Sequence, residues 1–533
     1  MGWSVGFINE LSKQQVAPSY RLKFDTISML GTINITSSSR VAAIGREGPT
    51  INGTRCIPQS WNITFGSWSV PVVGNIAEFF PSIRKGSFAE LYCTINGYEE
   101  RLTCGQLRNI KVNGNRFIFE FVDLLSMLGS NYELSPATGT PADPDPFTLM
   151  YSTNIETFPT SIWSGGSGFF PTQLFLNDIR GFSRETSENG VVRCVPASGD
   201  EFYLLWSSKT FTSGNSGYLT LAHTYQPTTT IYPTVFPPVT LQTTDKVYTA
   251  QYLNGFPADI FAKMLLSSDG TGTTFQKYPE EMNSHISLGA DFYDRNDAHS
   301  YKPFFKRDAN VDYEVGYVVN QPLTSGWRAL VQKFSKAGHW PVWRQNSLSY
   351  RPCVNPLDSY NRVVMGIDDS QIYSVMNHDL FATDQQNTYY RTGITYQNRQ
   401  GITNTRTVTT LTSEVPSLPV QSSNTRDNQD LYLPDPWAAS SDRFDLADAD
   451  VDRMRIWDLW PWEKIQLSVS IKYAQLVCGD LVTLSSSIFY GVNEAGNENT
   501  YTSRRAMVIG VDYNISQGTC VLTLAIPFLK ARR

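Results

Sequence analysis

Residues 504–526 read RRAMVIGVDYNISQGTCVLTLAI, and this stretch decides the fold class. Apolar side chains occupy alternate positions in both of its halves: Met507, Ile509, Val511 and Tyr513 before the turn, and Cys520, Leu522, Leu524 and Ile526 after it. Such alternation is typical of strands with one buried face, and Ser516-Gln517-Gly518 supplies turn residues between them. The stretch therefore predicts an antiparallel hairpin with one face in a core.

A third strand of the same kind precedes this hairpin. Ile465, Leu467, Val469 and Ile471 alternate with polar residues, and Gly479-Asp480 turns the chain before Leu481. We therefore expect residues 461–533 to form the β-barrel elements of a C-terminal domain.

The first 130 residues repeat the pattern. Residues 88–95 alternate and are followed by Asn96-Gly97, the favoured pair for a tight hairpin turn. Asn113-Gly114 predicts a second turn, and Phe117, Phe119 and Phe121 then share one face of a strand. Residues 1–130 are thus expected to form a first β-barrel domain.

The composition of residues 131–460 changes along the chain and divides them into four predicted segments. Residues 131–225 are rich in Pro, Gly and Ser and predict an irregular, loop-rich β insertion, and the Pro/Thr-rich residues 226–248 predict a linker. Residues 249–400 predict a small α+β unit with a helix at 257–266, a helix at 325–337 and a hairpin at 340–351. Residues 401–460 predict a loop-rich connector, in which residues 403–430 have little apolar periodicity and indicate a loop or an exposed irregular strand. The predicted fold class is mainly β with minor α.

Composition excludes several functional classes. Of 533 residues 41% are hydrophobic and only 17% charged, which argues against disorder and coiled coil. A net charge of −6 disfavours a dedicated nucleic-acid binder. No run approaches the roughly 18 apolar residues of a membrane span, and we expect neither a spanning segment nor a secretion signal. Seven scattered cysteines without a C-x-x-C pair indicate mostly reduced core residues.

The search for chemistry yields no catalytic residue, no metal site and no cofactor site. Five histidines lack ligand spacing, and no phosphate-binding glycine motif occurs. Two acidic segments resemble cation loops, but solvated surface is the more common explanation. They contain Asp291, Asp294, Asp297 and His299 in the first segment, and Asp445, Asp448, Asp450 and Asp452 in the second.

One aromatic cluster is a candidate binding surface. Trp457, Trp460 and Trp462 lie close together in the sequence WDLWPWE. Indole rings stack on sugars, but such clusters more often anchor protein interfaces. We therefore predict that these three residues lie at a subunit interface.

Several blocks, in order, resemble the tail-hub or baseplate-hub proteins of tailed bacteriophages. Within residues 58–128 they are PQSWNITFGSWSVPVVGN, IRKGSFAELYC, CGQLRNI and FIFEFVDLLSML. Later ones are FPADIFAKMLL, WRALVQKFSKAGHWPVWRQNSLSYRP, LVCGDLVTLSS and the hairpin quoted first. The resemblance covers about half of the chain, and the order of the blocks is more specific than any one block.

This resemblance implies a fold and a set of partners. Hub subunits carry two tube-like antiparallel β-barrel domains, and three subunits form a ring that joins a sixfold tail tube to a threefold tip or spike. The resemblance thus implies a homotrimer that contacts the tail tube or distal tail protein, the tip, spike or other baseplate proteins and the tape measure protein. DNA would only pass through its channel. It further implies a non-enzymatic virion protein of the tail tip, assembled in the cytoplasm of the bacterial host.

Two other functions remain open from the sequence. The aromatic, Ser/Thr-rich middle suits a tail adhesin or carbohydrate-binding tail protein. A tail-associated cell-wall hydrolase is the third candidate, because paired carboxylates for glycoside hydrolysis are set by distance in space rather than by sequence spacing.

Overall fold

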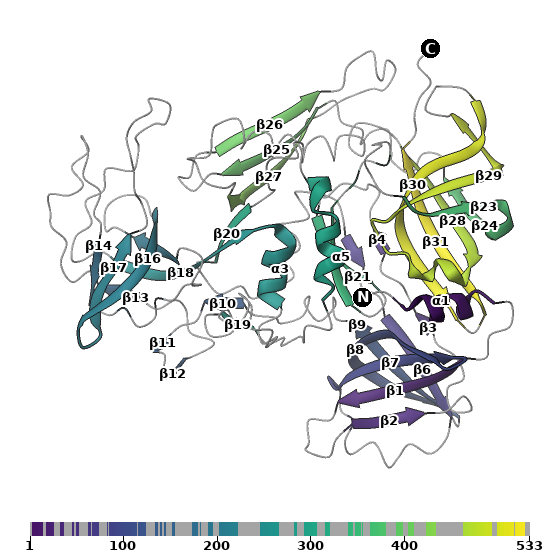
Figure 1. Cartoon of the computed structure of the whole chain (residues 1–533), viewed down its shortest axis with the longest axis horizontal. Coiled ribbons are helices and arrows are strands. Elements are labelled where there is room, and N and C mark those ends of the chain that lie inside the picture. The colour runs from purple at the N-terminus through teal and green to yellow at the C-terminus, as the bar shows by residue number, and fades with distance from the viewer. Residues whose placement is uncertain are drawn as a thin grey trace.

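The computed structural model shows a mainly β chain with three large sheets and a few short helices (Figure 1). The structure describes residues 3–13, 18–25, 32–36, 45–46, 50–52, 62–64, 67–73, 83, 85–114, 116–123, 134–136, 139–140, 143–144, 152–154, 173–177, 179, 182, 190–195, 202–221, 246–265, 282–284, 293–305, 315–319, 339–344, 347–352, 354, 356, 363–379, 391–397, 403–409, 423–432, 462–492, 498–515 and 517–527.

The N-terminal sheet has seven strands in the order β2-β1-β7-β8-β9-β6-β3. Their bounds are β2 Thr32–Thr36, β1 Ser19–Asp25, β7 Phe88–Ile95, β8 Tyr98–Asn113, β9 Arg116–Asp123, β6 Ser67–Val73 and β3 Gly45–Arg46. The two predicted hairpin turns are confirmed: Asn96 and Gly97 both have positive φ, 49° and 88°, and Gly114 has φ 61°. Phe119 and Phe121 are buried, as their alternation predicts.

The C-terminal sheet has the strand order β23-β29-β30-β31-β28-β24. Their bounds are β23 Val363–Asp368, β29 Leu481–Val492, β30 Glu498–Asn514, β31 Thr519–Pro527, β28 Trp462–Ser470 and β24 Ile372–Asp379. Strand β4 (Thr50–Asn52) pairs with both β30 and β5 (Asn62–Thr64), so a segment of the N-terminal third joins this sheet. The 3-10 helices η6 (Asp369–Gln371) and η8 (Ile471–Gln475) follow β23 and β28.

The predicted hairpin of β30 and β31 is confirmed, but one expected face is wrong. A bulge between Val508 and Gly510 inserts an extra residue into β30. A bulge reverses which face the following residues occupy. Met507 and Ile509 therefore pack in one core with Trp340, whereas Val511 and Tyr513 pack in a second, larger core.

The central sheet takes its strands from several of the predicted units. It runs β14-β17-β16-β15-β18-β20-β27-β25-β26, with β13 beside β18. Their bounds are β13 Ser152–Asn154, β14 Gln173–Leu176, β15 Gly190–Val195, β16 Phe202–Ser213, β17 Ser216–Leu221, β18 Lys246–Gly255, β20 Val315–Val319, β25 Arg391–Gln397, β26 Thr403–Thr409 and β27 Ser423–Tyr432. The sheet thus joins parts of the predicted insertion, the α+β unit and the connector.

Two strands, β26 and β27, lie in the segment expected to be a loop-rich connector. Their sequences, TNTRTVT and SNTRDNQDLY, lack apolar alternation. Backbone ladders form without such alternation, and β-branched Thr favours extended backbone. Parallel pairing of β25 with β27 supplies a ladder between segments that are distant in the sequence.

Smaller elements complete the described chain. The helices are α1 Val5–Leu11, α3 Pro257–Leu265 and α5 Arg295–Ser300, with the 3-10 helix η4 at Lys302–Phe305. The predicted hairpin is present as β21 (His339–Arg344) and β22 (Ser347–Pro352), and α3 coincides with the first predicted helix. Two short pairs are β10 (Leu134–Pro136) with β19 (Met282–Ser284), and β11 (Gly139–Thr140) with β12 (Asp143–Pro144). The helix expected at 325–337 lies outside the described residues, and the domain limits remain a prediction.

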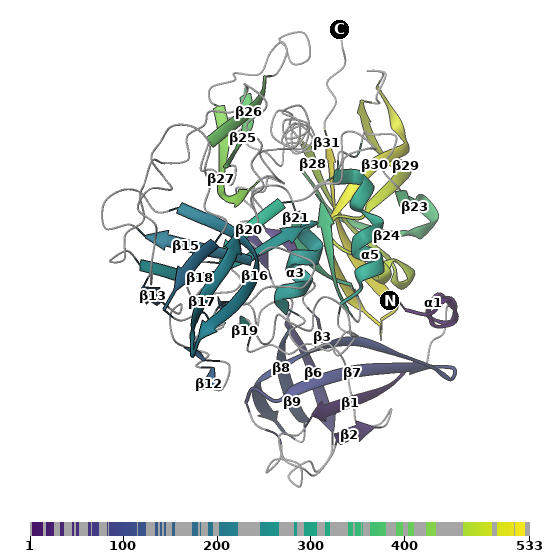
Figure 2. The same ribbon diagram turned by 60° about the vertical axis from the view of Figure 1, so that its left-hand side comes forward.

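The largest hydrophobic core joins the two ends of the chain. Leu22, Phe24 and Phe119 of the N-terminal sheet belong to the same buried cluster as Leu467 and Leu522 of the C-terminal sheet. Helix α1 lies between the two sheets (Figure 2).

Trp3 and the start of α1 hold this junction together. The Trp3 ring contacts the Tyr513 ring edge to face, with centroids 6.0 Å apart, and its Nε1 donates to Arg101 O at 3.1 Å. Ser4 caps the helix by accepting from Phe7 N. The two terminal sheets are therefore coupled by packing as well as by β4.

Candidate functional site

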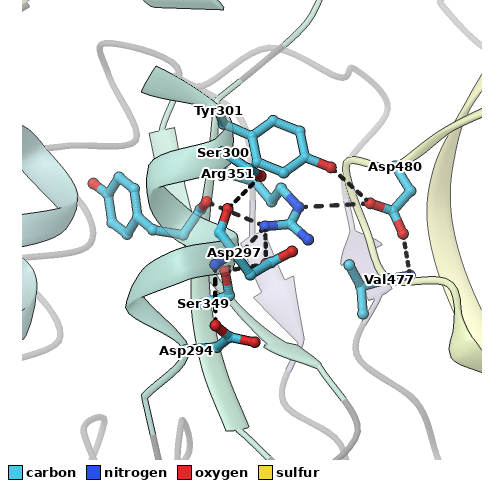
Figure 3. Close-up of polar contacts among 9 residues, drawn as sticks. Asp294, Asp297, Ser300, Tyr301, Ser349, Arg351, Val477 and Asp480 are labelled. Carbon is cyan, nitrogen blue, oxygen red and sulfur yellow. Dashed lines mark hydrogen bonds and ion pairs between the residues drawn. The ribbon is translucent and has the colours of Figure 1, made fainter. Parts of the chain in front are cut away.

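A buried arginine, Arg351, connects three elements from separate parts of the chain (Figure 3). It lies on β22, with 1% of its surface exposed. Helix α5 approaches from one side, and the turn between η8 and β29 approaches from the other. Asp294 starts α5 by accepting from Asp297 N at 3.0 Å, which fixes the carboxylate of Asp297 in the first turn.

Two carboxylates and a phenol ring surround the guanidinium. Arg351 Nη1 lies 2.5 Å from Asp297 Oδ2, and Arg351 Nε lies 3.6 Å from Asp480 Oδ1. The Tyr301 ring lies 4.1 Å from the guanidinium carbon, and the Tyr301 hydroxyl donates to Asp480 Oδ1 at 3.1 Å. The Ser349 hydroxyl donates to Asp297 and accepts from Arg351 Nη1. We call Arg351, Asp297, Asp480, Tyr301 and Ser349 the arginine cluster.

The turn at Gly479-Asp480 is shaped for this contact. Gly479 has φ +95°, which a side chain disfavours, and a Cβ there would lie 3.3 Å from Arg351 Cβ. Asp480 Oδ2 accepts from Val477 N at 3.0 Å, so the carboxylate also ties its own turn. The turn can therefore approach Arg351 closely while directing Asp480 toward it.

The surroundings of Arg351 and Tyr301 fix the protonation states of these two residues. Burial alone would lower the pKa of Arg351, but Tyr301, Asp480 and Asp297 raise it above its ordinary value. Burial, and then the charge of Asp480, raise the pKa of the Tyr301 phenol. At neutral pH the guanidinium is thus charged and the phenol is neutral. The arrangement suits a fixed structural connection rather than proton transfer.

A second cluster with a buried carboxylate lies on β28, beside the edge strand β24 of the C-terminal sheet. Glu463 on β28 is 1% exposed, accepts from the Tyr501 hydroxyl and lies 3.2 Å from His378 Nε2 on β24. Burial, with the Glu463 charge next in size, raises the pKa of Tyr501. His378 also contacts the Phe489 ring edge to face. This cluster attaches the edge strand β24 to the sheet.

Of the three tryptophans predicted at a subunit interface, the structure describes Trp462. Trp462 is 2% exposed and packs with Trp340, Met507 and Ile509 inside one chain. Trp457 and Trp460 lie outside the described residues, and the interface role stays a prediction for all three tryptophans.

The acidic segment around Asp294 also has internal partners. Asp294 caps α5 and Asp297 pairs with Arg351, while His299 Nε2 lies 2.6 Å from Asp259 Oδ1 on α3. Asp291 and the second acidic segment, Asp445 to Asp452, lie outside the described residues. In the ranges given above, no group of three His, Cys, Asp or Glu side chains is arranged to hold a metal ion.

Five cysteines in the described part of the chain are free and buried, as the sequence predicts: Cys93, Cys104, Cys194, Cys478 and Cys520. Burial raises the pKa of the Cys93 thiol to about 12. No helix among the described residues is both long and apolar enough to cross a bilayer.

The sequence prediction missed the arginine cluster. A signal exists for Asp480, which is the one charged residue in the apolar run LVCGDLV, whereas Arg351 lies in SLSYRP, where polar and apolar residues alternate. A charge in a strand with buried neighbours requires a partner. Which partner it finds cannot be deduced from sequence spacing, since Asp297 and Asp480 are far from Arg351 in the chain.

Comparisons with known proteins give weak likenesses to tail proteins. No family model and no curated protein matches the chain. A tail protein from Neisseria meningitidis aligns over 95% of this chain and 96% of its own, with 10% identity and a TM-score of 0.37. A 43 kDa prophage tail protein from Shewanella oneidensis covers 95% and 98%, with 8% identity and a TM-score of 0.35. A prophage tail protein from Listeria monocytogenes covers 95% and 94%, with 10% identity and a TM-score of 0.34. At these scores the likenesses assign neither a fold nor a family.

Proposed function

We propose that the chain is a non-enzymatic structural protein of a bacteriophage tail, specifically the trimeric hub of the tail tip or baseplate. In this role it joins the sixfold tail tube to a threefold tip or spike and lines the channel through which DNA is ejected. The ordered sequence blocks described above support this proposal.

The observation that carries the proposal is the shared core of the two terminal sheets. Residues from both ends of the chain, among them Trp3 and Tyr513, pack in one buried cluster. One subunit therefore offers two β modules in a fixed relation. Three such subunits place six modules around one axis, which suits a sixfold tube on one side and a threefold spike on the other.

The topology of the C-terminal sheet supports a closed barrel, which we include in the proposal. Strands β23 and β24 are the two edges of the sheet and are separated only by η6. β23 is parallel to β29 and β24 is antiparallel to β28, so both edge strands run in the same direction. A single bent segment thus carries both edge strands, and η6 holds them near each other, as closure of the sheet into a barrel requires.

The proposed partners follow from this position. They are two further copies of the chain, the tail tube or distal tail protein, the tip, spike or other baseplate proteins, and the tape measure protein. DNA is a passing cargo, and a net charge of −6 is compatible with a channel that does not retain phosphate. Free buried cysteines are compatible with assembly in the host cytoplasm.

Mass photometry of the full chain, alone and with its tail-tube protein, tests this function. We expect particles of three times the monomer mass. A chain that remains monomeric in both conditions contradicts the hub. Binding of host surface glycan by the isolated chain would favour the adhesin, and clearing of peptidoglycan in a zymogram would favour the hydrolase.

A further inference from the structure

We propose that the β23–η6–β24 edge of the C-terminal sheet docks the β8–β9 hairpin of a second copy of this chain. The inference rests on the trimeric hub proposed above and identifies the two surfaces that meet in it.

The receiving surface is an apolar patch on a sheet edge. Among the described residues nine large apolar side chains are exposed, and five of them gather on β23, β24 and the adjoining part of β29. We call these five the edge patch: Val364, Tyr373, Val375, Met376 and Ile488. Tyr373, Met376 and Ile488 are 59%, 56% and 59% exposed. Ser486 and Ser487 donate to Asp369 of η6, which places the Ile488 segment beside η6.

The position of β24 strengthens the case for a partner. β24 ends the strand order of its sheet, with β28 on its inner side. Five consecutive residues, 373–377, are exposed along it. An exposed edge with apolar side chains favours association unless another surface covers it. The described part of the chain leaves this edge accessible.

Opposite charges on the two surfaces indicate that the β8–β9 hairpin docks at the edge patch. Residues 363–379 contain three acidic residues, Asp368, Asp369 and Asp379, and no Lys or Arg. The tip of the β8–β9 hairpin, residues 108–116, contains three basic residues, Arg108, Lys111 and Arg116, and no Asp or Glu. All six are exposed in a single chain. Hydrogen bonds from Ser486 and then Ser487 lower the pKa of Asp369, so that carboxylate is ionised at neutral pH.

The hairpin also supplies an apolar group for the patch. Val112 lies at its tip and is 65% exposed. Two of the six charges have an opposite charge nearby in their own chain: Lys464 is opposite Asp379 in the β24–β28 register, and Lys111 Nζ lies 2.5 Å from Glu120 Oε1. The other four charges carry most of the proposed attraction between the two surfaces. The hairpin belongs to the N-terminal sheet and the edge patch to the C-terminal sheet, and we assign their contact to two different copies of the chain. Two different surfaces in contact form a head-to-tail interface, which closes into a ring when the rotation permits.

The first test changes the edge patch by one charge. We expect Met376→Asp to weaken trimer formation at least tenfold in mass photometry, because it places a carboxylate in an apolar contact. Higher salt should also weaken the wild-type trimer, since charge attraction contributes. The control is Phe211→Asp, which changes a 49% exposed ring outside both surfaces and should leave assembly unchanged.

Crosslinking tests the contact directly. The full chain carrying Val112→Cys and Tyr373→Cys, treated with a short bis-maleimide, should give covalent trimers, whereas the pair Val112→Cys and Phe211→Cys should not. If the wild type forms trimers but Met376→Asp assembles equally well and the first pair gives no crosslink, the docking surface is wrong and the hub remains. If the wild type forms no trimer under any condition, the hub and the docking surface are both overturned.

Discussion

Arg351 illustrates how one residue connects segments that are distant in the sequence. Its charge is held between Asp297 on α5 and Asp480 in the turn before β29. Taking charges out of water is unfavourable, and partners recover that free energy only when their geometry is good. The arginine cluster therefore fixes how α5 and the β21–β22 hairpin pack on the C-terminal sheet.

Removal of this guanidinium should be strongly destabilising. We expect Arg351→Met to lower the free energy of unfolding by about 3–5 kcal/mol, because it leaves buried carboxylates without their counter-ion. Urea unfolding followed by tryptophan fluorescence measures this loss. The matched control is Arg21→Met, which breaks the more exposed pair with Glu99 and should cost about 0.2–1 kcal/mol. Equal losses in the two variants would contradict a special role for Arg351.

Glu90 should make the N-terminal sheet sensitive to acid. Burial alone would raise the pKa of Glu90, but hydrogen bonds from Lys23 and Arg101 lower it below 4.5, its ordinary value. A carboxyl with a lowered pKa in the folded state stabilises the fold above pH 4.5, and this stabilisation disappears as the pH falls through the folded-state pKa.

The substitution Glu90→Gln tests this pH dependence. The wild type should lose stability as the pH falls below 4.5, and the variant should be less stable at neutral pH but lose less on acidification. Unfolding by urea at a series of pH values measures both slopes. Glu120→Gln, at a solvent-exposed pair with Lys111, is the control and should follow the wild type closely. Parallel pH curves for wild type and Glu90→Gln would refute the linkage.

At the scale of elements, strands in which apolar and polar residues alternate were predictable from the sequence, and strands without this alternation were not. The hairpins at Asn96-Gly97, Asn113-Gly114 and 516–518 follow directly from turn residues between alternating runs. The bulge in β30 was not predictable, because the run from Met507 to Tyr513 alternates without interruption and only pairing with β31 reveals the extra residue. For β26 and β27 the sequence leaves a loop or an exposed irregular strand open, because neither segment has an apolar period.

Sequence also failed to predict which elements pack together. The central sheet pairs strands from three predicted units, and β4 pairs across to β30. The clusters around Arg351 and Glu463 were unpredictable for the same reason, because the partners of these two residues come from segments that only tertiary packing brings together. Local pattern thus specifies strands and turns, whereas sheet order and buried ion pairs depend on contacts between distant segments.

The turn at Asn96-Gly97 should respond to a single methyl group. Gly97 has φ 88°, where a Cβ is disfavoured, although no atom lies within 4 Å of a Cβ built there. We expect Gly97→Ala to lower the unfolding free energy by about 1–2 kcal/mol through backbone strain alone. Asn96→Gly is the control and should change it by less than about 0.5 kcal/mol. A neutral Gly97→Ala would show that the turn is not held in the left-handed conformation.

For the whole molecule, the junction of the terminal sheets determines cooperativity. Trp3 is 5% exposed and contacts Phe7 and Tyr513. We expect Trp3→Ala to cost about 3–5 kcal/mol and to separate the unfolding of the two terminal sheets into distinct steps. Val5→Ala, at a 74% exposed side chain on the same helix, should leave unfolding unchanged. Hydrogen exchange measured in both sheets distinguishes coupled from separate unfolding.

The arrangement of two coupled β modules also bears on the role in a particle. In the proposed ring each chain is one third of the assembly, and the edge patch and the β8–β9 hairpin are the surfaces through which we propose that neighbouring copies meet. The arginine cluster attaches α5 and the β21–β22 hairpin to the C-terminal sheet of each chain.

Electron microscopy of the assembled tail, with this chain located by its density, tests the central claim most directly. The account predicts three copies around the tail axis, between the tube and the tip, with the N-terminal and C-terminal sheets alternating around the channel. A single copy, or copies placed away from the axis, would contradict it.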